Sequence, residues 1–318
     1  MTFTCRPMRP KDVHECVDIV AAHPVIRQRY GDALSDLKAV WLALMGREAF
    51  RPVVFEDSQH SHAGIIGDGV SVFVSDHFLR ALKRSPFFWV GPELTRWLSS
   101  GQAPLLSDCE MRQRNARGGL TVATWEGAIR AEFLHCPEVL TAFCSAFIEN
   151  HQGFLLNEVL GQGMTRDTLD LSLRSGFLLL QEDGRYADSG ESPLDEVFEK
   201  PHHIGLTREL ALSRVGSWVG SLFVCQAPQC GFRPSEQRLL LTALRGGTDE
   251  ELANDLAISI SAVKKMWLSI YERVSTHLPS LLPNRTFMQE SVERGREKKQ
   301  RLLNYLREHP EELRPASP

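Results

Sequence analysis

Long hydrophobic runs are missing from this chain of 318 residues. No stretch approaches the roughly 18 uninterrupted apolar residues that a membrane-spanning helix needs, which argues against a transmembrane protein. The first residues also lack the apolar run of a secretory signal peptide. We therefore expect a cytoplasmic protein with no membrane partner.

Paired cysteines are missing as well. The seven cysteines are scattered, their number is odd, and no two of them are separated by only two residues. In a reducing compartment such cysteines are small buried side chains rather than disulfide partners or zinc ligands. Cys225 and Cys230 follow His202 and His203, but this spacing is a weak indication of a metal site. We expect no bound metal and no cofactor.

A large excess of one charge is also absent, since the net charge of the whole chain is −4. The two parts of the chain differ, however. Residues 232–318 hold 14 Lys and Arg against 12 Asp and Glu, whereas residues 1–231 hold 22 against 28. A weakly basic C-terminal part suits contact with phosphates without establishing it. The length and this asymmetry predict two domains.

The first 180 residues predict an α/β domain. Runs rich in Val, Ile, Phe and Thr indicate strands, and apolar residues at helical spacing indicate helices. We expect strands over 3–7, 52–56, 63–75, 120–125 and 177–180, and helices over 13–21, 33–47, 78–83, 92–99 and 137–160. The polar, turn-rich stretch 181–193 predicts a boundary, so that 181–230 becomes a connecting segment.

The order of these elements resembles the N-acetyltransferase fold of the GNAT family. Arg6 to Asp12, followed at once by a helix, resembles the way in which those domains begin. The resemblance implies a Q/R-x-x-G-x-G/A loop whose backbone amides bind the diphosphate of acetyl-CoA in front of a helix. Residues 125–130, where the loop is expected, have one glycine at the wrong spacing, and the basic stretch 114–119 precedes a strand.

The N-terminal domain is therefore expected to sense a small-molecule ligand or to hold a dimer, without catalytic residues. His135 adjoins Cys136, and Glu126 and Glu132 are near in sequence, but a nucleophile and its base must meet in space. We interpret these residues as structural. An N-acetyltransferase fused to a DNA-binding domain is the alternative.

From residue 231 onward the pattern changes to short helices. Pro234 suits the first turn of a helix, and Gly246 and Gly247 suit its end. Thr248 and Glu251 have the spacing of a capping box for a second helix. After a turn at 257–259, a third helix starts at Ser259 or Ser261 and has one apolar face, made of Val263, Trp267, Ile270 and Val274.

The opposite face of that third helix is polar and basic. Two short helices joined by a tight turn, the second of them basic at its start, are what entry into the major groove of DNA requires. We expect contacts to double-stranded DNA from residues on and around this helix, namely Thr248, Ser259, Ser261, Ala262, Lys264, Lys265, Leu268, Ser269 and Tyr271. The alternative is a helical hairpin that has no role with nucleic acid.

This segment resembles the helix-turn-helix of LuxR-type regulators over about 45 residues. The positions that match that motif include Pro234, Glu236, Thr248, Glu251, Leu252, Ala253, Leu256, Ile258, Ser259, Val263, Lys264, Ile270 and Tyr271. Ala257 departs from it, because it stands where the family has a turn glycine; this implies a turn without positive φ, or mild strain. Ala262, Met266 and Trp267 also depart, which puts the base preference in doubt.

The resemblance implies a bacterial transcriptional regulator at the nucleoid, expected to be a homodimer. We assign 1–180 to the GNAT-like α/β domain, 231–278 to a small all-α helix-turn-helix domain and 279–318 to a charged helical tail. Residues 294–301 in that tail have five basic residues and one acidic residue. They could clamp phosphates, face solvent or contribute to a dimer contact.

Overall fold

The chain divides into two units. The computed structural model describes residues 3–57, 64–84, 88–134, 136–181, 185–187, 197–214, 216–282 and 291–315. The first unit, an α/β unit, comprises residues 1–151 and 155–224, and the second, a helical unit, comprises 152–154 and 225–318. Each unit is described here by itself.

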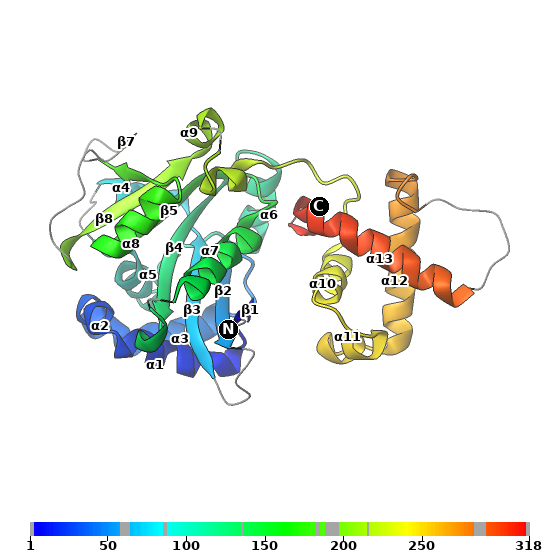
Figure 1. Cartoon of the computed structure of the whole chain (residues 1–318), viewed down its shortest axis with the longest axis horizontal. Helices are drawn as coiled ribbons and strands as arrows, with labels where there is room; N and C mark the ends of the chain where they lie inside the picture. Colours follow the sequence, from blue (N-terminus) through cyan, green and yellow to red (C-terminus); the bar gives the residue numbers. More distant parts are fainter. Residues whose placement is uncertain are drawn as a thin grey trace. The chain divides into compact units, whose positions relative to one another are not determined.

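The α/β unit is built on a mixed sheet of eight strands in the order β1-β2-β3-β4-β5-β8-β6-β7 (Figure 1). The pair β4 and β5 is parallel, and the other described neighbours are antiparallel. The strands are β1 (Phe3–Pro7), β2 (Phe50–Asp57), β3 (Ile65–Phe73), β4 (Leu120–Ile129), β5 (Leu156–Thr165), β6 (Leu178–Leu180), β7 (Tyr186–Ala187) and β8 (Val197–Thr207).

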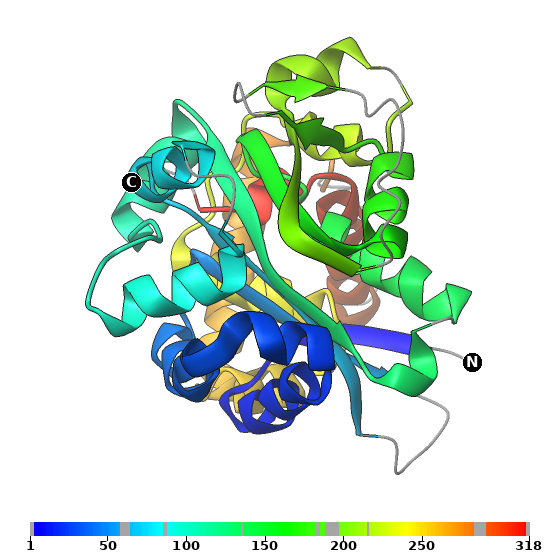
Figure 2. The same cartoon turned by 90° about the vertical axis from the view of Figure 1, so that its left-hand side faces the viewer.

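Helices cover both faces of this sheet (Figure 2). On one face α1 contacts β3 and β4 and α5 contacts β4, whereas α7 contacts β1 and β2 on the other face. Side chains of a strand alternate between the faces, so adjacent residues such as Asp68 and Gly69 face opposite layers. The helices are α1 (Val13–Ala22), α2 (Pro24–Tyr30), α3 (Leu34–Leu44), α4 (Asp76–Arg84), α5 (Val90–Ser99), α6 (Asp108–Ala116), α7 (Pro137–His151), α8 (Arg166–Arg174) and α9 (Arg208–Ser213).

The parallel strands β4 and β5 separate along their length. Their pairing runs from Leu120 to Ala123 on β4 and from Leu156 to Leu160 on β5, although each strand has ten residues. Beyond that point β4 stays paired with β3, and β5 stays paired with β8. The sheet therefore opens between Thr124 and Gly161.

The sequence predicted the order of elements in this unit well. Strands β1 to β4 and β6 lie where the sequence predicted strands, with helices between them, which confirms the α/β class of this unit. The single helix expected over 137–160 is wrong: α7 ends at His151 and β5 begins at Leu156. Gly153, at φ +83°, lies in the turn between them. The apolar pattern of the sequence continues across this turn, and for that reason the two elements were expected to be one helix.

The connecting segment expected over 181–230 is also wrong, because most of its described residues belong to the α/β unit. Residues 197–207 form β8, which pairs with β5 and β6 inside the sheet, and α9 and the 3-10 helix η4 (Val219–Phe223) follow it. Burial of Leu206, Leu222 and Phe223 explains why this segment belongs to the α/β unit. Of the boundary predicted at 181–193, residues 182–184 and 188–193 lie outside the described part of the chain.

The helical unit contains α10 (Pro234–Ala243), α11 (Asp249–Asp255), α12 (Ile260–His277), α13 (Ser291–Glu308) and the 3-10 helix η5 (Pro310–Leu313). An all-α unit was expected here, and the start of α11 after Thr248 follows the capping signal of the sequence. The helix α10 ends at Ala243, earlier than the expected end at Gly246 and Gly247, which have positive φ in the turn that follows. The core of this unit is apolar and includes Leu239, Leu252, Val263, Trp267, Ile270, Val274, Leu302 and Leu306.

A membrane-spanning helix was not expected. Within the part of the chain that the structure describes, none of the helices combines the length and the apolar character that crossing a bilayer requires.

Candidate functional site

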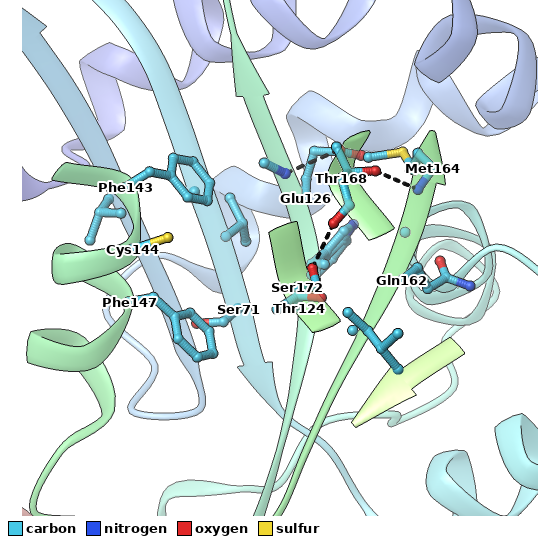
Figure 3. A pocket seen from close by; sticks show the side chains of 18 of the residues that line it. Ser71, Thr124, Glu126, Phe143, Cys144, Phe147, Gln162, Met164, Thr168 and Ser172 are labelled. Carbon is cyan, nitrogen blue, oxygen red and sulfur yellow. Dashed lines mark hydrogen bonds between the residues drawn. The ribbon is translucent and has the colours of Figure 1, made fainter. Parts of the chain in front are cut away.

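A pocket lies where β4 and β5 separate in the α/β unit (Figure 3). Phe143 and Phe147 point from α7 toward the strands, and Thr168 and Ser172 on α8 line it from another side. Most of the wall is apolar or aromatic, and a few polar groups converge on it, which is typical of sites for small molecules.

Glu126 on β4 is the ionisable group of special interest in this pocket. It is 7% exposed, and its Oε1 accepts a hydrogen bond of 3.1 Å from the amide of Gly127. Burial raises the pKa of Glu126 to about 7, although Tyr30 and Arg29 act in the opposite direction. A carboxyl group with such a pKa can bind or release a proton near neutral pH.

A second acid, Asp68, precedes Gly69 on β3, and its side chain faces the opposite side of the sheet, where it is fully buried. Among the described residues, neither of its oxygens has a hydrogen-bond partner. Burial, and then the nearby Glu126 carboxylate, raise the pKa of Asp68 well above its usual range. Burial therefore favours the neutral form of Asp68, and its proximity adds to the cost of a second negative charge at this point of the sheet.

Ser71 and His151 form a hydrogen-bonded pair in the wall of the pocket. The Ser71 Oγ lies 2.7 Å from His151 Nε2, and His151 Nδ1 lies 2.7 Å from the carbonyl oxygen of Phe147. A carbonyl can only accept, so Nδ1 carries a proton and donates to Phe147. Both side chains are buried, and the contact with the histidine positions the serine hydroxyl.

Arg29 and Trp89 close the pocket from the side of α2 and α5. The Arg29 guanidinium lies 3.7 Å from the centroid of the Trp89 ring, and its Nη2 donates to the carbonyl oxygen of Met164 at 2.8 Å. Burial lowers the pKa of Arg29 to about 10, which leaves it charged at neutral pH. The pocket thus offers a cation and a titratable acid within one apolar wall.

The loop between β4 and α7 does not fit the diphosphate of acetyl-CoA. The amides of Phe133, Leu134 and Cys136 donate to carbonyl groups within this loop, and those of Val139 and Leu140 donate to Cys136. Pro137 has no amide hydrogen, and the Cys136 thiol donates to the Glu138 carboxylate. Because these amides are used internally and Glu132 and Glu138 add negative charge, the described part of the loop is a poor cradle for an anion.

Glu126, Glu132, His135 and Cys136 are near one another in sequence, and all four were expected to be structural. The structure separates them: Glu126 lines the pocket, whereas Cys136 contacts Glu138 outside it. His135 lies outside the described residues. The signal that could have singled out Glu126 is a carboxylate between Trp125 and Gly127 in an otherwise apolar strand.

In the helical unit, α11 and α12 are joined by a tight turn. Thr248 Oγ1 accepts the Glu251 amide and the Glu251 carboxylate accepts the Thr248 amide, so the predicted capping box is observed. In the turn, Ala257 donates to Asn254, and Ile258 donates to Ala253. Ala257 has φ +52°, so of the two expectations for this position the strained one is correct.

The two faces of α12 differ in burial as the sequence predicted. Val263, Trp267, Ile270 and Val274 are buried in the unit's core. Ser261, Lys264, Lys265 and Leu268 are exposed, and they recur at the spacing of one helical stripe on the opposite side. Leu268 is 63% exposed.

Other predicted DNA contacts already have partners within the unit. Ser259 Oγ accepts the amide of Ala262, and Ser269 Oγ donates to Glu236 Oε1 at 2.8 Å. Tyr271 is partly buried and its ring stacks on that of Trp267, with centroids 5.7 Å apart. The DNA contacts of these residues, of Thr248 and Ala262, and of the exposed residues of α12 remain predictions.

No family model and no curated protein matches this chain. Similar solved structures include a histone acetyltransferase and related acetyltransferase from Corynebacterium glutamicum, with 15% identity and a TM-score of 0.37, covering 64% of this chain and 96% of that chain. Spermidine N-acetyltransferase from Vibrio cholerae, solved with CoA and spermine, has 11% identity and a TM-score of 0.38, covering 66% and 98%. An uncharacterized protein from Bacillus halodurans has 8% identity and a TM-score of 0.37, covering 68% and 89%. Similarity at this level assigns the α/β unit no family, ligand or activity.

Proposed function

We propose that this protein is a DNA-binding transcriptional regulator, in which α12 enters the major groove and the α/β unit responds to a small molecule. The observation that carries the proposal is the exposed stripe of α12. Lys264 and Lys265 are exposed on the side of the helix opposite to its buried residues. An α-helix fits the major groove, and lysines at its N-terminal half reach phosphates and base edges.

Charge along α12 supports the same orientation. The first turns carry Lys264 and Lys265 and no acidic side chain, whereas Glu272 appears on the exposed side further along. A carboxylate near the DNA backbone is repelled by phosphates, so the contact is expected to end before Glu272. Residues 260–268 are therefore the proposed reading segment.

A salt series of gel-shift measurements with the full chain tests this proposal. Each lysine that neutralises a phosphate changes the slope of log affinity against log salt by about 0.9. We expect Lys264→Ala and Lys265→Ala to weaken binding and each to reduce the slope by about that amount. Lys38→Ala, an exposed lysine of the α/β unit, is the matched control. Unchanged affinity and slope in both α12 variants would contradict the proposal.

A second copy of the chain is part of the proposal. Dimeric regulators place two reading helices on half-sites about one turn of DNA, roughly 34 Å, apart. Sedimentation of the full chain with a duplex of two half-sites should give two chains per duplex. A single half-site should then bind far more weakly, and equal affinity for both duplexes would exclude this arrangement.

Acyl transfer is the second candidate, and Glu126 is the observation that favours it. A carboxyl group with a pKa of about 7 inside an apolar pocket suits a general base. Titration calorimetry with acetyl-CoA tests it, with Glu126→Gln as the comparison. Because the loop before α7 does not fit the diphosphate, we expect no heat at micromolar acetyl-CoA, and clear micromolar binding would overturn that expectation.

A further inference from the structure

We propose that Leu268 selects thymine, by packing its side chain against the 5-methyl group of that base in the major groove. This inference rests on the proposed DNA binding of α12 and adds a specificity-determining residue to it. It is an inference about one contact, and it can fail while DNA binding itself holds.

Leu268 lies in the middle of the exposed stripe. It is four residues from Lys264 and three from Lys265, so all three side chains project from the same side of the helix. Its side chain is 63% exposed, and it belongs neither to the core of the helical unit nor to the residues packed against that core. A helix that places its two lysines on phosphates therefore carries Leu268 toward the base edges between them.

The chemistry of the groove identifies the group that such a side chain can contact. The edges of guanine, adenine and cytosine present hydrogen-bond donors and acceptors, which a leucine would leave without partners. Thymine presents a methyl group at the same depth of the groove. Burying that methyl against an apolar side chain contributes about 0.8 kcal/mol, or about fourfold in affinity.

The same helix offers a matched control. Ile260 is also apolar and 40% exposed, but it lies eight residues from Leu268, which places it roughly 80° away around a helix of 3.6 residues per turn. Ile260 is thus on the flank of the stripe rather than at its centre. Exposure of an apolar side chain alone would give the two residues equal effects, whereas the proposed contact would not.

The experiment first selects binding sites from random synthetic duplexes with the full chain. Each thymine of the selected site is then replaced by deoxyuridine, which removes the methyl group and keeps the hydrogen-bonding edge. We expect one thymine in each half-site at which deoxyuridine lowers the affinity about fourfold. In Leu268→Ala that substitution should have no effect, whereas in Ile260→Ala it should keep its full effect.

Each outcome has a defined meaning. If the chain selects a site but no deoxyuridine matters, or if its effect persists in Leu268→Ala, the thymine contact is refuted and DNA binding stands. If Leu268→Ala and Ile260→Ala lose the effect alike, Leu268 has no special role and the inference fails. If no duplex is enriched and none is bound at low salt, the proposed function fails and the inference fails with it.

Discussion

The turn between α11 and α12 makes a sharp prediction, because it holds an alanine in a conformation that favours glycine. Ala257 has φ +52° and occupies the position just after the C-terminal cap of α11. Its amide donates to Asn254, and the amide of Ile258 donates to Ala253, which is the hydrogen-bond pattern of a Schellman motif. We therefore expect Ala257→Gly to stabilise the helical unit.

The magnitude follows from two opposing effects. A left-handed conformation costs an alanine about 1–2 kcal/mol relative to glycine. Glycine also destabilises the folded state by about 0.4–1 kcal/mol, because the unfolded chain loses more conformational entropy on folding when it has glycine at this position. The difference is a gain of about 1 kcal/mol. For a unit of this size, such a gain raises Tm by about 4–8 °C.

Calorimetry of the full chain measures this shift, and hydrogen exchange of the peptides from α11 and α12 assigns it to the helical unit. Ala262→Gly is the control, because that residue lies inside α12, where glycine costs about 1 kcal/mol. The two substitutions should move Tm in opposite directions. If Ala257→Gly lowered Tm as Ala262→Gly does, the left-handed turn assigned to Ala257 would be wrong.

Three further substitutions test the interiors of the two units. The pKa of Glu126 is about 7 in the folded protein against an ordinary 4.5, so its ionisation lowers the free energy of unfolding as pH rises between these values. Glu126→Gln removes this effect. It should raise the free energy of unfolding at pH 8 by on the order of 3 kcal/mol, but not at pH 4. Urea denaturation at both values checks this, with Glu158→Gln, which loses an ion-paired buried carboxylate, expected to destabilise at pH 8. Gly127→Ala would place a Cβ 2.7 Å from the Phe143 ring and should cost about 1–3 kcal/mol, seen as a lower Tm; an unchanged Tm would show that the ring does not rest there. Glu312→Ala removes the acceptor of two backbone amides, and a loss of about 2–4 kcal/mol is expected in the helical unit; protection from hydrogen exchange in α10 that stays at its original level would contradict this role.

The sequence predicted elements well where periodicity and caps agree. Thr248 and Glu251 fixed the start of α11, and the spacing of Val263 and Trp267 fixed the buried face of α12. These signals are local, because a cap and a helical stripe are set by residues within one or two turns. Strands β1 to β4 were predicted from alternation patterns that are local in the same way.

The pocket could not be predicted in this way. It forms because β4 and β5 separate after Ala123, and strand pairing between distant segments leaves no mark in either segment alone. Glu126 gains its unusual pKa from burial, which depends on the packing of distant residues such as Tyr30 and Arg29 of α2 around it. β8 was overlooked because its polar His202 and His203 masked a strand that is inserted between β5 and β6.

The last described residues of the chain have a consequence for biosynthesis. Glu312 is 1% exposed and accepts the amides of Gln229 and Cys230, while Gln237 on α10 donates to the carbonyl oxygen of Arg314. A nascent chain lacks these partners until the ribosome has added residue 314. Products of premature termination would therefore emerge with α10 and the segment before it incompletely held, and would be open to proteolysis there.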